Sequence, residues 1–148
     1  MKKELAIFWF RRDLRLHDNA GLFHALKNES RVLPIFIFDK AILSKLEDRD
    51  DARVNFIHQA VAALKVSLRA MGSDIYVLHS NPMDAFEELI KDNQVTRVYT
   101  NHDYEPYALE RDEAIRRRLN QDGIEFLTYK DQVIFEKSEV VKEDGKPY

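Results

Sequence analysis

Two patterns of hydrophobic and polar positions alternate along the chain. Short apolar runs predict buried strands over residues 5–10, 32–38, 74–79, 95–100 and 124–128. Between them, apolar residues recur every three or four positions, which predicts helices near 19–28, 54–68, 82–90 and 106–119. Cap residues support these bounds, with Asp18 or Asn19 before the first helix and Gly72 after the second.

The strand–helix alternation predicts an α/β fold. Apolar strands separated by amphipathic helices are typical of a parallel sheet with helices on both faces. Right-handed crossovers then give a three-layer, doubly wound, Rossmann-like sandwich with a five-stranded parallel sheet. Pro34 is unfavourable in the second strand because it lacks a backbone N–H. We also expect a short helical turn at 41–45 and β-like pieces at 133–135 and 140–141.

Composition narrows the possible classes of protein. The 148 residues fit one domain, and the absence of cysteine excludes a disulfide framework, a cysteine-ligated metal and a thiolate nucleophile. A net charge of −3 makes the chain by itself a poor nucleic-acid binder. The sequence has neither a convincing signal peptide nor the roughly 20 apolar residues of a membrane span, so we expect a cytoplasmic protein without membrane contacts.

Ligands of doubly wound sheets bind beyond the carboxyl ends of the strands. This rule selects three polar loops: 11–19, 39–53 and 101–107. The glycine-rich phosphate-binding motifs are missing, and the five histidines lack metal-ligand spacing. We therefore predict no metal site.

Two arginine-rich segments have alternative interpretations. Arg11, Arg12, Asp13 and Arg15 can hold an anionic ligand or form a structural ion-pair cluster bridged by Asp13, and the second interpretation is favoured. The run 116–118 suggests nucleic-acid binding. However, Asp112 and Glu113 each precede an arginine by four residues, which favours ion pairs on a solvated helix face.

The loop after the fourth strand carries two carboxylates. Asp103 and Glu105 can accept hydrogen bonds from a ligand, or they can cap the helix that begins at Pro106. Tyr104 and Tyr107 can pack on a flat ligand ring or on the next helix.

Several segments in order resemble the DNA photolyase/cryptochrome flavoproteins. The first is Phe8–Asn19, with its Arg-Arg-Asp-Leu-Arg sequence. The others are Val32–Asp39, Arg53–Phe56 with the helix that follows, Asn101–Tyr107 with Arg111 and Asp112, and Gly145–Tyr148. The resemblance spans the whole chain, and ordered motifs of this length are far more specific than any single short one.

The resemblance implies a division of roles between two domains. Residues 1–130 correspond to the family's N-terminal α/β domain, and 131–148 to the start of a linker to a C-terminal helical domain. That second domain holds FAD, binds UV-damaged DNA and splits pyrimidine dimers with light. We therefore assign no catalytic residue to this chain and expect it to be inactive by itself.

In this family the α/β domain houses a light-harvesting antenna chromophore. By resemblance, its pocket here uses Phe36, Ile37, Phe38, Asp39, Ile42, Arg53, Asp103 and Glu105. The ring slot would be formed by Phe36, Phe38, Ile42 and Phe56. Folate-binding members carry Asn-Glu where this chain has Tyr107-Ala108. This difference favours a deazaflavin or flavin over methenyltetrahydrofolate.

Two alternatives stay open. The first is a cryptochrome, a blue-light photoreceptor that shares this domain and performs no repair. The second is a stand-alone nucleotide-binding module of Rossmann-like fold, which would bind ATP or AMP.

Overall fold

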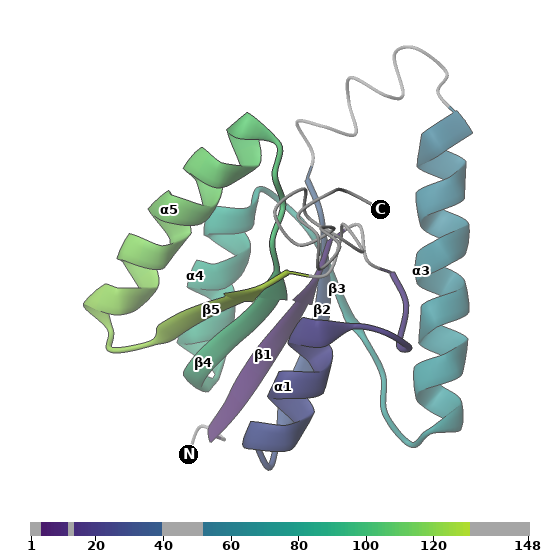
Figure 1. The fold of residues 1–148 in the computed structure, drawn as a ribbon, viewed down its shortest axis with the longest axis horizontal. Helices are drawn as coiled ribbons and strands as arrows, with labels where there is room; N and C mark the ends of the chain where they lie inside the picture. The colour runs from purple at the N-terminus through teal and green to yellow at the C-terminus, as the bar shows by residue number, and fades with distance from the viewer. Residues whose placement is uncertain (1–3, 12–13, 40–51, 131–148) are drawn as a thin grey trace, which may run out of the picture.

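Five parallel strands form a single sheet in this protein (Figure 1). A computed structural model describes residues 4–11, 14–39 and 52–130, with residues 52–54 described as backbone only. The turn expected at 41–45 and the β-like pieces after residue 130 lie outside these residues. The elements in chain order are β1 (Glu4–Phe10), α1 (Ala20–Asn28), β2 (Val32–Phe38), α3 (Ala52–Ala70), β3 (Tyr76–His79), α4 (Pro82–Asp92), β4 (Gln94–Asn101), α5 (Pro106–Gln121) and β5 (Glu125–Tyr129).

The strand order β3-β2-β1-β4-β5 confirms the predicted doubly wound topology. Every neighbouring pair is parallel. The chain builds β2 and β3 on one side of β1, then returns across β1 to add β4 and β5 on the other. The winding therefore reverses between β1 and β4, which is where ligands bind in sheets of this type.

Helices cover both faces of the sheet, as predicted (Figure 1). One core cluster joins the sheet to α4 and α5 and includes Ile7, Trp9 and Phe86. The other joins it to α1 and α3 and includes Phe8 and Phe10. Because successive side chains of a strand point to opposite faces, the central strand β1 is buried on both sides and reads as an unbroken apolar run.

Pro34 occupies a position of β2 where its missing N–H does little harm. It pairs with Phe8 of β1, whereas pairing between β2 and β3 begins only at Ile35. In its first half β2 thus has a paired neighbour only on the β1 side, so the proline is tolerated as at a sheet edge.

The N-terminus of α1 is bonded directly to the end of β4. The Asn19 side chain accepts a hydrogen bond from the Leu22 N–H (3.0 Å), which confirms Asn19 as the helix cap. The Asn101 side chain donates to Asn19 (2.8 Å) and accepts from the Gly21 N–H (2.8 Å). A Cβ atom on Gly21 would lie 2.8 Å from both Asn101 Oδ1 and the Phe8 ring, so this close approach requires glycine.

The C-terminal end of α1 is also fixed to β4. The buried Tyr99 hydroxyl donates to Glu29 (2.7 Å), which also accepts from Arg97 (3.0 Å). Burial, followed by the hydrogen bond to Glu29, raises the pKa of Tyr99 to about 12. Tyr99 therefore stays protonated over the physiological range, and α1 is held against β4 at both ends.

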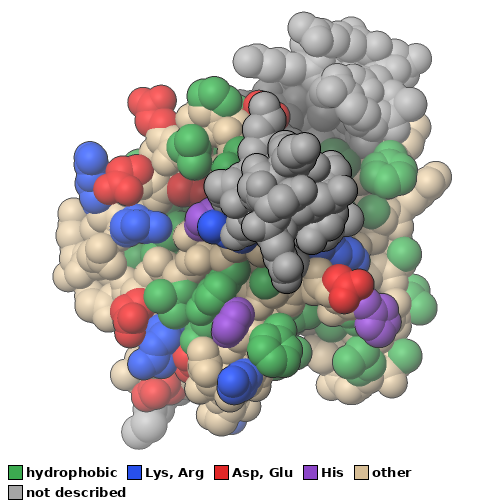
Figure 2. Space-filling model, in the orientation of Figure 1, with side chains coloured by type: hydrophobic (Ala, Val, Ile, Leu, Met, Phe, Trp, Pro, Cys, Tyr) green, Lys and Arg blue, Asp and Glu red, His purple; other side chains and the backbone are tan. Residues whose placement is uncertain are grey.

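The visible surface carries charges of both signs close together. Figure 2 shows acidic and basic side chains interspersed on the side of α4 and α5. Ion pairs on these helices include Arg118 with Glu87, and Arg117 with Glu113 (3.4 Å). None of the helices in the described part of the chain is long and apolar enough to cross a membrane.

Replacing Gly21 with alanine should destabilise the protein. Helix propensity alone would make Gly21→Ala stabilising by about 1 kcal/mol. The contacts at Asn101 and Phe8 instead predict a loss of about 1–3 kcal/mol, because the added methyl group forces α1 away from β4. Urea denaturation measures the sign. Ala63→Gly on the exposed side of α3 calibrates the propensity effect, and a stabilised Gly21→Ala variant would contradict the packing described here.

Candidate functional site

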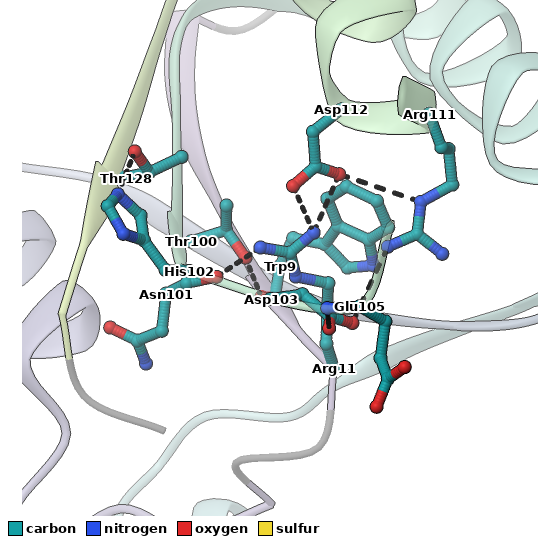
Figure 3. Close-up of polar contacts among 10 residues, drawn as sticks. All are labelled: Trp9, Arg11, Thr100, Asn101, His102, Asp103, Glu105, Arg111, Asp112 and Thr128. Atoms are coloured by element: carbon teal, nitrogen blue, oxygen red, sulfur yellow. Dashed lines mark hydrogen bonds and ion pairs between the residues drawn. The ribbon is translucent and has the colours of Figure 1, made fainter. Parts of the chain in front are cut away.

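Polar residues that follow β1 and β4 come together where the winding of the sheet reverses (Figure 3). Arg11 follows β1, and the loop 102–105 follows β4. Helix α5 begins immediately after that loop. The carboxyl edge of the sheet therefore gathers side chains from β1, β4 and α5.

The Arg11 side chain connects the elements of this group. Its side chain is only 7% exposed, and its Nη1 lies 2.7 and 2.6 Å from the two carboxylate oxygens of Asp112. Its Nη2 donates to the backbone carbonyl of Asn101, the last residue of β4. One guanidinium thus joins β1, β4 and α5.

Trp9 lies beneath two guanidinium groups. Arg11 is 4.8 Å and Arg111 is 5.1 Å from its ring centroid. Phe86 of α4 packs edge-to-face on the same indole at 5.2 Å. Cations over an aromatic ring are stabilised by its quadrupole, so the buried indole helps to fix both arginines.

The Asp103 carboxylate lies beside this cluster and is almost fully buried at 4% exposure. Its Oδ1 accepts a hydrogen bond from the Glu105 N–H (3.1 Å), and its Oδ2 is 3.9 Å from Arg111. Arg111 is itself 3.5 Å from Asp112. Asp103 is therefore oriented by a tight turn on one side and a guanidinium on the other.

Glu105 is the N-cap residue of α5, but its side chain makes no capping hydrogen bond. The capping alternative is therefore wrong for the Glu105 side chain. The Asp103 side chain accepts from the backbone N–H of this N-cap residue. Tyr104 and Tyr107 are 39% and 50% exposed, and Arg111 lies over the Tyr107 ring at 5.7 Å.

The prediction that Asp112 forms a surface ion pair is wrong. We expected it to pair with Arg116 on a solvated face, yet it is buried and binds Arg11. The expected pair between Glu113 and Arg117 is present and exposed. A signal for Asp112 existed, because it falls in the spacing of Ala108, Ile115 and Leu119 on the buried side of α5.

Arg11 forms an ion pair, as the structural interpretation of the first arginine-rich segment expects, but the described partner is Asp112. Bridging by Asp13 stays a prediction, because Arg12 and Asp13 lie outside the described residues. Arg15 bonds to the carbonyls of His17 (3.1 Å) and Asp18 (2.8 Å), which fixes the loop before α1.

The predicted residues of β2 divide between the two faces of the sheet. Phe36 and Phe38 are buried toward α1 and α3, with their rings edge-to-face at 4.8 Å. Ile37 is buried toward α4 and α5. The Phe38 ring also stacks on His58 (4.6 Å) and His79 (4.9 Å). The half-buried Asp39 follows at the carboxyl edge.

The other predicted pocket residues are only partly placed. Ile42 lies outside the described residues. Arg53 lies in the first turn of α3, and its side chain is not described. Phe56, expected to help form the ring slot, is 69% exposed and joins neither core cluster. Among the described residues, His, Asp and Glu side chains nowhere form a group of three suited to a metal ion.

A parallel doubly wound sheet with polar side chains at its reversal point is typical of α/β domains that bind ligands. The sequence model of the family described as DNA photolyase matches residues 6–148. The chain belongs to this family and corresponds to its N-terminal α/β domain. Family membership does not support a stand-alone nucleotide-binding module.

Three proteins illustrate the similarity. A deoxyribodipyrimidine photo-lyase of Halobacterium salinarum is 33% identical over 153 residues, covering 97% of this chain and 31% of the relative. Cryptochrome-2 of Arabidopsis thaliana is 34% identical over 143 residues, covering 96% and 23%. The crystal structure of an archaeal photolyase from Sulfolobus tokodaii superposes with a TM-score of 0.76 at 33% identity, covering 91% and 31%. It is described as containing two FAD molecules and as implying a novel light-harvesting cofactor. The chain therefore spans a third or less of the length of these proteins.

Removing the charge of Asp112 should destabilise the domain strongly. Asp112→Asn leaves Arg11 buried without its carboxylate, and breaking a buried pair costs about 3–5 kcal/mol. The neighbouring Glu113→Gln removes the same charge from an exposed pair and should change stability by less than about 0.5 kcal/mol. Chemical denaturation of both variants checks the difference, and equal losses would show that burial of the Arg11 pair is unimportant.

Proposed function

We propose that the full natural protein is a deoxyribodipyrimidine photolyase and that this domain holds its light-harvesting chromophore. The observation that carries the proposal is the family match over residues 6–148, together with relatives named photo-lyases. In this proposal a following helical domain supplies FAD and the pocket for UV-damaged DNA, and residues 131–148 lead toward it. The protein acts in the cytoplasm.

The surface of this domain supports a role other than DNA binding. The chain carries a net charge of −3, and Figure 2 shows acidic side chains among the basic ones on the visible face of the described residues. A surface that binds the DNA backbone concentrates Lys and Arg. We therefore assign DNA contact to the helical domain and light collection to this one.

The proposed antenna is a deazaflavin or a flavin. When bound, this group absorbs light and passes the excitation energy to FAD. Asp103 supplies a buried acceptor for a ring N–H or a side-chain hydroxyl of the chromophore. The presence of Tyr107-Ala108 disfavours a folate, and the two FAD molecules described for the Sulfolobus tokodaii photolyase support a flavin-type second chromophore.

The placement of the described residues fits a ring lying across strand ends. Strands β2 and β4 flank β1, so their carboxyl ends are about 10 Å apart. A tricyclic ring can reach from Asp39, after β2, to Asp103, after β4. Phe36 and Phe38 are buried toward α1 and α3, so they support this edge of the sheet from one face. In this proposal Ile42 and Arg53 also contact the chromophore.

Variants of the polar residues test the antenna site. Asp103→Ala and Arg53→Ala should each lower the deazaflavin bound per FAD in the full natural protein, by about tenfold or more, because each removes a charged contact to the chromophore. Glu110→Gln, on the exposed side of α5, serves as the control. Absorption spectra of the reconstituted variants measure occupancy. Unchanged uptake in both variants would mean that the antenna binds elsewhere.

Repair of damaged DNA distinguishes the proposed photolyase from a cryptochrome, which the Arabidopsis thaliana relative makes the second candidate. The full natural protein with reduced FAD should restore thymine-dimer DNA under blue light. Residues 1–148 alone should not, because they contain neither the FAD site nor the lesion pocket. Failure of the intact, fully reduced protein would favour the cryptochrome, and repair by residues 1–148 would refute the division of roles.

A further inference from the structure

We infer that Arg11 is a positioning residue for the antenna site, because it fixes the loop that carries Asp103 and Glu105. This inference rests on the proposed function, in which those carboxylates face the chromophore. Arg11 itself is not proposed to touch the chromophore. Its side chain is almost fully buried and its charge is already directed at Asp112.

Arg11 contacts the chain on both sides of the loop 102–105 (Figure 3). Before the loop, its Nη2 donates to the carbonyl of Asn101. After the loop, its Nη1 binds both carboxylate oxygens of Asp112 within α5. The end of β4 and the second turn of α5 are thus held at a set separation, which restricts how far the loop between them can shift.

Arg111 transmits this arrangement to the Asp103 side chain. It lies 3.5 Å from Asp112 and 3.9 Å from Asp103, and it is 5.1 Å from the Trp9 ring centroid. Asp112 therefore lies within ion-pair distance of both Arg11 and Arg111. If Arg11 released Asp112, this carboxylate would be free to move, Arg111 would lose one of the contacts that position it, and the side of Asp103 that faces Arg111 would be less constrained.

The residue type at position 11, an arginine, supports a role in positioning the loop rather than in stability alone. Buried ion pairs often stabilise a fold no better than an apolar pair of the same volume, because both charges lose their hydration. The planar guanidinium, in contrast, presents several N–H groups in fixed directions and can reach Asn101 and Asp112 together. A lysine keeps the charge but has no such fork.

The following experiment distinguishes a positioning role of Arg11 from a contribution to folding stability alone. Arg11→Lys retains the charge, and the double variant Arg11→Met with Asp112→Leu replaces the pair with apolar groups. Melting temperature and the dissociation constants for FMN and a 5-deazaflavin are measured on the full natural protein after removal of its antenna. We expect both variants to bind about tenfold or more weakly, and the double variant to recover the melting temperature that Arg11→Lys loses. Arg118→Lys, in the exposed pair with Glu87, should leave binding unchanged.

Wild-type affinity in the double variant would overturn the inference and reduce Arg11 to a structural residue. Wild-type affinity in Arg11→Lys would overturn it as well. The two proposals fail differently. If Asp103→Ala binds normally, the antenna site itself is misplaced. If Asp103→Ala loses affinity while the Arg11 variants retain it, only the positioning role is refuted.

Discussion

The contact of the Arg11 guanidinium with Asn101 and Asp112 is the interaction on which the rest of the site depends. It joins residues 90 and 101 positions apart at the point where the winding of the sheet reverses. Because both groups are buried, water does not solvate their charges, and each charge must keep its partner. A shift of β4 or α5 would separate the pair and leave a buried charge without a partner, so the contact selects one arrangement of these elements.

Asn101, whose carbonyl binds Arg11, is also held by residues on the opposite face of the sheet. While Arg11 binds the Asn101 carbonyl, the Asn101 side chain bonds to Asn19 and to the Gly21 N–H. The end of β4 is thus bonded to both helix layers, and the loop with Asp103 begins directly after this bonded residue. A ligand site needs such preorganised polar groups, because ordering them on binding would weaken affinity.

Local patterns were sufficient to predict the fold, and insufficient to predict the ion pairs. Strands β1 and β2 are buried on both faces, so their apolar runs identified them, and Asn19 capped α1 as its residue type suggests. Asp112 was misassigned because helical spacing to Arg116 resembled a surface pair, while its true partner lies in another element. The outward orientation of Phe56 likewise follows from how α3 packs, which no local pattern of charges or rings determines. The roles of Ile42 and Arg53 remain predictions.

We propose that the carboxyl edge of this sheet holds a tricyclic antenna whose polar ligand is Asp103. The most direct measurement is the absorption spectrum of the full natural protein purified from its source, with the released chromophores identified by mass. We expect a deazaflavin or a second flavin in addition to one FAD. Methenyltetrahydrofolate as the second chromophore, or FAD alone, would contradict it.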